Sequence, residues 1–74
     1  MHFLIYTNHH GSKLIDFGDE VLKLRSQMIE AQQLEQPGGQ MALVNQDTMR
    51  ETFLCDEFGL PVKDDGWMIR LDDL

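Results

Sequence analysis

The chain has 74 residues, and a domain of this length buries only about 60% of its unfolded surface, which leaves a thin core. Hydrophobic residues make up 42% and charged residues 26% of the sequence, a balance that excludes both a disordered chain and a membrane protein. Acidic residues outnumber basic ones by 13 to 6, a formal charge of -7 that disfavours direct binding of nucleic acid or anionic lipid. We therefore expect one soluble, acidic domain over residues 1–74.

The first predicted elements are two strands, residues 2–7 (HFLIYT) and 12–17 (SKLIDF), because both runs are rich in strand-favouring residues. The intervening NHHG reads as a tight loop, since Asn8 and Gly11 suit left-handed backbone angles. Together they predict a β-hairpin.

The second predicted element is a helix over residues 19–36, which acidic residues open and PGG closes. At 100° per residue it carries two apolar seams: Val21, Leu24, Met28 and Ala31 form the first, and Leu22 and Ile29 form the second. One seam packs on the sheet and the other is left for a second contact. We assign Val21, Leu24, Met28 and Ala31 as a possible dimer seam; the alternative is one broad buried face beside which Arg25 stretches to solvent.

After the PGG break, residues 41–45 (MALVN) predict a central strand. The following run divides between two interpretations. A short helix is favoured by a capping box of Thr48 with Glu51 and by Gly59 as a stop, whereas residues 51–55 (ETFLC) would also suit a strand.

The last predicted element is a hairpin of residues 60–63 and 67–71 around a three-residue loop, DDG, that ends in glycine. In it Trp67, Ile69 and Leu71 share one face, and Met68 and Arg70 the other. The whole pattern predicts an α+β fold, a small, mostly antiparallel sheet with two hairpins and one long helix packed on one face, plus the possible second short helix.

Residue types that carry chemistry occur without the spacing that chemistry needs. His2, His9, His10 and Cys55 are zinc-ligand types, but they match no zinc signature. The adjacent carboxylate pairs lie outside any EF-hand pattern, and no phosphate-binding loop occurs. A single cysteine also excludes an internal disulfide, and MHFLIY lacks the features of a signal peptide. We expect a cytoplasmic protein that is not an enzyme, with no catalytic residue, metal or cofactor.

The distribution of charge suggests a partner instead. Residues 38–74 carry eight acids and three bases, against five acids and three bases in residues 1–37. A negative surface attracts basic surfaces over about 8 Å at physiological salt. The expected partner-binding residues combine acidic side chains with an apolar anchor: Asp56, Glu57, Asp64, Asp65, Trp67, Met68, Asp72 and Asp73.

Two hypotheses follow for function. The first is a small acidic binding protein that docks on a basic surface of a larger protein, without contacting nucleic acid or membrane directly. Phage-encoded inhibitors of nucleic-acid-handling machines, such as anti-CRISPR proteins and polymerase inhibitors, share this size and charge, an analogy that no residue motif extends. The alternative is a homodimeric structural or regulatory accessory protein that uses helix 19–36 as its interface.

Overall fold

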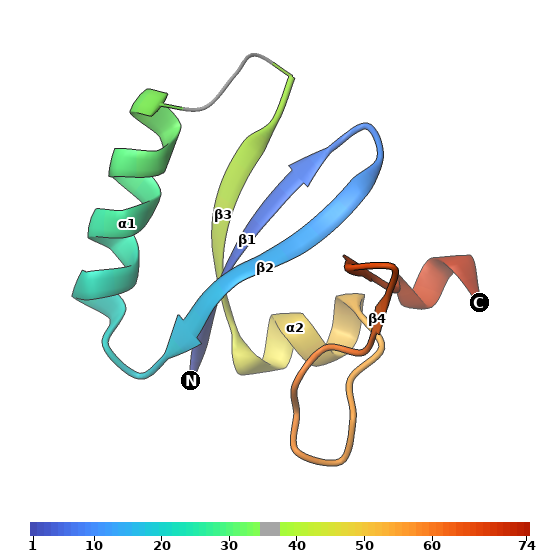
Figure 1. Cartoon of the computed structure of the whole chain (residues 1–74). Helices are drawn as coiled ribbons and strands as arrows, with labels where there is room; N and C mark the ends of the chain where they lie inside the picture. The colour runs from blue at the N-terminus through green and yellow to red at the C-terminus, as the bar shows by residue number, and fades with distance from the viewer. Residues whose placement is uncertain (35–37) are drawn as a thin grey trace.

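The computed structural model describes residues 1–34 and 38–74, and Figure 1 shows how the elements are arranged. In chain order they are β1 (His2–Asn8), β2 (Gly11–Gly18), α1 (Val21–Leu34), β3 (Gln40–Asn45), α2 (Gln46–Thr52), β4 (Lys63–Asp64), β5 (Trp67–Met68) and the 3-10 helix η1 (Leu71–Asp73). The predicted α+β class, with its two hairpins and its short second helix, is confirmed.

Strand β1 is the centre of a three-stranded antiparallel sheet of order β2-β1-β3. Its residues Phe3, Leu4 and Ile5 are all buried, although successive side chains of a strand point to opposite faces. Both faces of the sheet are therefore covered, by α1 on one side and by the segment 46–74 on the other (Figure 1). A continuous apolar run, rather than an alternating one, is what such a strand requires.

Helix α1 packs on the sheet through the seam that contains Leu24. Leu24 is buried with Leu4 and Met41, and Met28 and Ala31 pack against that cluster. A dimer formed through this seam would have to pull these side chains out of the core. Among the α1 residues whose burial the structure describes, the exposed apolar ones are Leu22, 77% exposed, and Ile29, 50% exposed. The helix begins at Val21, two residues later than expected, and the expected end at Gln36 lies outside the described residues.

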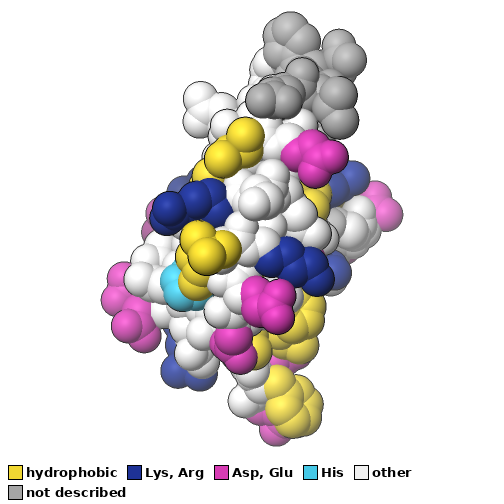
Figure 2. Space-filling view, turned by 90° about the vertical axis from the view of Figure 1, so that its left-hand side faces the viewer, with side chains coloured by type: hydrophobic (Ala, Val, Ile, Leu, Met, Phe, Trp, Pro, Cys, Tyr) yellow, Lys and Arg dark blue, Asp and Glu magenta, His cyan; other side chains and the backbone are white. Residues whose placement is uncertain are grey.

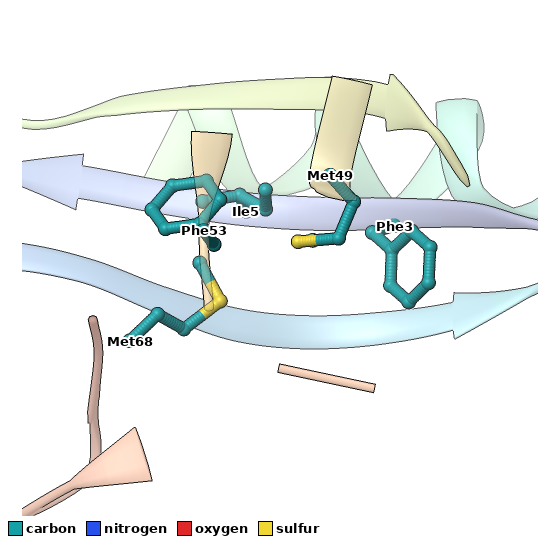
Figure 3. Close-up of a cluster of buried hydrophobic side chains, with 5 residues drawn as sticks. All are labelled: Phe3, Ile5, Met49, Phe53 and Met68. Carbon is teal, nitrogen blue, oxygen red and sulfur yellow. The ribbon is translucent and has the colours of Figure 1, made fainter. Parts of the chain in front are cut away.

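The other face of the sheet carries the second core cluster, drawn in Figure 3. It consists of five buried side chains from β1, α2, the residue after α2, and β5: Phe3, Ile5, Met49, Phe53 and Met68. Two methionines suit this place, because a flexible thioether side chain fills the irregular gap between a short helix and a sheet. Segment 46–74 therefore rests on a small core of its own beneath β1.

Helix α2 begins at Gln46, because the side chain of Asn45 caps it. The Asn45 Oδ1 accepts the backbone N–H of Thr48 at 2.8 Å, so Asn45, and not Thr48, is the capping residue. The helix ends at Thr52, and the expectation that Gly59 terminates it is wrong.

Beyond α2 the chain becomes extended, so the strand interpretation of residues 51–55 is half right. Phe53 and Cys55 form isolated antiparallel bridges with Arg70 and Pro61. Because the first half of this run is helical and the second half extended, its apolar residues follow neither the helix period of 3.6 residues nor the strand period of two.

The second hairpin turns through two residues, and not through the three expected. Asp65 and Gly66 have φ angles of 54° and 84°, which a two-residue type I′ turn requires. The sequence placed Trp67 and Met68 on opposite faces without deciding which of them is buried. Met68 is the buried residue of β5, whereas Trp67 turns towards β2, where the Lys13 Nζ lies 4.4 Å from its ring centroid.

The first hairpin turns at His9 and His10. The Asn8 Oδ1 accepts the backbone N–H of His10 at 2.8 Å, so Asn8 acts through its side chain. The expected left-handed angle at Asn8 is not found: among the described non-glycine residues only Asp65 has a positive φ. Gly11, with φ 144°, supplies that conformation here.

Candidate functional site

The sheet separates the molecule into two layers of different charge. The layer of residues 46–74, here called the acidic layer, carries eight acidic and three basic side chains, a formal charge of -5. All eight acidic residues are exposed: Asp47, Glu51, Asp56, Glu57, Asp64, Asp65, Asp72 and Asp73. The C-terminal half therefore places its whole acid excess in solvent on one side of the sheet.

These carboxylates have no cationic partner within the part of the chain that the structure describes. The one ion pair there joins the Met1 amino group to Asp19, at 3.3 Å, in the other layer. On the side of the molecule that α1 covers, apolar, basic and acidic side chains lie interspersed (Figure 2). Because their charge is not neutralised internally, the eight carboxylates are available to an external basic surface.

The acidic layer contains an ordered loop between Cys55 and Pro61. One carboxylate oxygen of Asp56 accepts the backbone N–H groups of Phe58, at 2.9 Å, and of Leu60, at 3.0 Å. The Asp56 amide donates to the Leu60 carbonyl at 2.8 Å, and the Gly59 amide donates to the Asp56 carbonyl at 3.0 Å. With the bridge of Cys55 to Pro61, these bonds fix the loop from both ends.

The side chain that this loop presents is Phe58, which is 76% exposed. Gly59 beside it is buried, and an added Cβ there would lie 3.5 Å from the Arg50 guanidinium, so the loop packs against α2. The arrangement combines a fixed backbone, an aromatic ring in solvent and two flanking carboxylates, Asp56 and Glu57. Rigid exposed aromatic residues are enriched among interface hot spots.

Phe58 was missed as a candidate in the sequence, because the run 46–61 was divided between a short helix and a strand, and the turn that carries Phe58 was not recognised. A signal was nevertheless present. Asp56 and Gly59 occupy the first and fourth positions of a turn, where aspartate and glycine are preferred in type I turns.

The expected partner-binding residues divide into two groups. Asp64 and Asp65 lie at the β4–β5 turn, and Asp72 and Asp73 lie in η1, all exposed in the acidic layer together with Asp56 and Glu57. The expected apolar anchors lie elsewhere. Met68 is only 6% exposed, and Trp67 packs at the first hairpin, with its ring 6.1 Å from that of His10. Phe58 is the exposed aromatic residue of the acidic layer.

The histidines and the cysteine lie apart from each other. His9 and His10 lie side by side at the tip of the first hairpin, with ring centroids 3.9 Å apart and ring planes inclined at 42°. The Cys55 thiol faces the carbonyl oxygens of Phe53, at 3.5 Å, and Met49, at 3.8 Å. Burial, with a smaller contribution from Asp56, raises the pKa of this thiol, while Arg50 lowers it less, so the neutral form is favoured.

The geometry of the described ranges, 1–34 and 38–74, contains no group of three or more His, Cys, Asp or Glu side chains that could hold a metal ion. None of the helices in those ranges is both long enough and apolar enough to cross a membrane. Comparison with models of protein families, with curated proteins and with solved structures found no match for this chain. The function has to be inferred from the geometry of the chain itself.

Proposed function

We propose that this protein is a non-catalytic binding protein whose acidic layer docks on a basic surface of a larger protein. The observation that supports this proposal is the combination, in one layer, of eight exposed carboxylates without a described cationic partner and the fixed, exposed ring of Phe58.

The two parts have different roles. The carboxylates attract the partner from a distance and orient the encounter, which mainly affects the association rate. Phe58 then enters a pocket of the partner, where full burial of a phenylalanine contributes about 1.5–3 kcal/mol. Because hydrogen bonds to Asp56 already order the loop, little backbone entropy is lost when Phe58 is buried.

The finer proposal concerns the kind of partner. Surfaces that hold nucleic acid are strongly basic, and an acidic layer of charge -5 competes for such a surface. We propose a nucleic-acid-handling machine of the host cytoplasm as the partner and a phage-type inhibitor, of the anti-CRISPR or polymerase-inhibitor class, as the role. The size and the net charge of the chain support this finer step.

The test begins with affinity capture of the partner from the native host and its identification by mass spectrometry. The association rate constant to that partner is then measured at about 0.05 M and about 0.5 M salt, where we expect a fall of at least about tenfold. Phe58→Ala should increase the dissociation rate, while Ile29→Ala on the other layer should change neither rate. A flat salt dependence, or equal effects of the two substitutions, would contradict the proposal.

The inhibitor role has its own readout. A nucleic-acid competitor should displace this protein from the captured partner, and excess of this protein should displace the nucleic acid. Simultaneous binding of both would exclude occlusion of the nucleic-acid surface, although docking itself would stand.

A second candidate function is a homodimeric structural or regulatory protein. It is favoured by one observation, the exposure of Leu22 and Ile29 one heptad apart on α1. Sedimentation at micromolar concentration tests it directly: a dimer that Leu22→Glu disrupts would support this function, and a monomer at every concentration would remove it.

A further inference from the structure

A groove runs between α1 and β2, on the side of the sheet opposite the acidic layer. Its first part, about 200 Å³, lies between residues 16–20, which end β2 and lead into α1, and Lys23 and Leu24 of α1. Its second part, about 290 Å³, is lined by Ile15 on β2 and by Gln27, Glu30 and Ala31 on α1. Both parts lie between β2 and α1, one after the other along the helix.

One wall of the groove is the outer edge of the sheet. Strand β2 is an end strand in the order β2-β1-β3, so alternate backbone N–H and C=O groups point away from β1. Trp67 packs against Gly11 at one end of β2, and in the described chain no strand pairs with the outer edge from Leu14 to Gly18. That stretch is open to an added strand.

A second copy of this chain is a poor occupant for the edge. The register of β1 with β2 shifts between Leu4 and Ile5 and leaves Ile15 as a bulged residue, around which any added strand has to pair. Two copies of this chain would each bring a formal charge of -7 and repel each other. The occupant therefore needs the opposite charge.

The lining of the groove specifies that charge. The groove has four carboxylates, those of Asp16, Asp19, Glu20 and Glu30. The basic groups beside them are the Lys23 ammonium and the Met1 amino group, which pairs with Asp19. Apolar contact comes from Ile15, 51% exposed.

We propose that this groove binds an extended, positively charged peptide segment, which adds to β2 as a fourth strand of the sheet. Side chains of an added strand alternate between the two faces, so every second residue points towards α1. Lysine or arginine at those positions would meet the carboxylates with its charged end and pack its aliphatic stem against Ile15. This site does not depend on the acidic layer, which lies across the sheet.

The test uses a fluorescein-labelled peptide of eight residues, the length of β2, with alternating lysine and valine. At about 0.15 M salt, where charges more than about 8 Å apart are screened, we expect saturable binding by fluorescence anisotropy. In ¹⁵N–¹H NMR spectra the amides of Leu14–Gly18 and those on the groove side of α1 should shift. Shifts confined to residues 46–74 would place the peptide on the acidic layer and overturn the proposal.

Two matched variants separate the groove from general electrostatics. Glu20 and Glu30 are exposed, so their replacement by lysine leaves the core intact and should weaken peptide binding roughly tenfold or more. Asp72→Lys with Asp73→Lys makes the same change of net charge in the acidic layer and should leave the affinity within about twofold. Equal weakening by both pairs would show that only net charge attracts the peptide.

A third comparison tests strand addition itself. The same peptide with N-methyl groups on alternate residues keeps its charge but cannot donate hydrogen bonds to the β2 edge, so it should lose binding. Undiminished binding of the methylated peptide, or equal binding of a glutamate-valine peptide, would contradict the proposed mode. Because none of these measurements involves the partner of the acidic layer, their failure leaves the proposed function standing, and the reverse also holds.

Discussion

Asp56 holds Phe58 in solvent. The Asp56 Oδ1 accepts the backbone N–H of Phe58 at 2.9 Å while the phenyl ring stays 76% exposed. An apolar ring in water gains nothing from that position in the free protein, whereas the hydrogen bond fixes the backbone that carries it. The pair therefore stabilises a conformation suited to contact with another molecule.

The first prediction concerns this hydrogen bond. Asp56→Ala should speed hydrogen exchange at the amides of Phe58 and Leu60 and lower the free energy of unfolding by about 0.5–1.5 kcal/mol. Asp56→Asn keeps an Oδ1 acceptor and should retain most of the protection. Glu57→Ala removes the same charge with no recorded hydrogen bond to the loop, so an equal effect of Glu57→Ala would refute the assigned role of Asp56.

The second prediction compares two leucines of α1. Leu24 is 2% exposed against Leu4 and Met41, whereas Leu22 is 77% exposed. Leu24→Glu buries a charge without a partner and should unfold the protein or cost more than about 4 kcal/mol. Leu22→Glu should change stability by less than about 0.5 kcal/mol. Urea denaturation followed by circular dichroism measures both, and similar midpoints would disprove the packing of α1.

The elements with strong local signals were predictable from the sequence. The strand-rich run 2–7 and the uninterrupted run before PGG formed the strand and the helix that they predict, and DDG formed the expected hairpin, although through a turn of two residues. The region after β3 was less predictable, because residues 46–52 are helical and Phe53 and Cys55 are extended. No single period describes such a run.

The face assignments needed tertiary information. Alternation in β5 allows either Trp67 or Met68 to face inward, and residue size favours the tryptophan. The structure buries Met68, because the space between Phe53 and Ile5 suits a flexible side chain, while the Trp67 ring lies against Gly11 of β2. Composition predicted the acidic residues of the expected partner-binding set. It did not predict the exposed aromatic residue, Phe58, because the turn that begins at Asp56 was not recognised.

The third prediction tests the cap of α2. The Asn45 Oδ1 accepts the Thr48 N–H, so Asn45→Ala should cost roughly 0.5–2 kcal/mol of unfolding free energy. Asn45→Asp keeps the acceptor and should be nearly neutral. Thr48→Ala leaves the backbone N–H donor in place, so its cost should be smaller than that of Asn45→Ala. The opposite order, measured by urea denaturation, would restore Thr48 as the cap.

The fourth prediction concerns the entry to β3. A Cβ added at Gly39 would overlap the ring and hydroxyl of Tyr6, which packs on the α1 face of the sheet. Gly39→Ala should therefore lower stability by about 1–3 kcal/mol, the usual cost of overpacking. Combining it with Tyr6→Leu, which removes the overlapping ring, should recover part of the loss. Strictly additive effects in this double-mutant cycle would show that the two residues do not touch.

The fifth prediction follows from the raised pKa of Cys55, which burial causes mainly and Asp56 adds to, against a lowering by Arg50. The folded state favours the neutral thiol, so the unfolded state releases this proton first as the pH rises. The stabilisation from Cys55 is thus complete below the ordinary thiol pKa of 9.0 and is lost as the pH rises through the higher folded value. Cys55→Ala lacks this titration, so the difference in unfolding free energy between the two proteins should shrink on going from neutral pH to above pH 9.

In parallel, iodoacetamide should alkylate native Cys55 more slowly than the urea-unfolded chain at the same pH. Equal alkylation rates, together with a pH-independent difference in stability, would show that the thiol is not shielded.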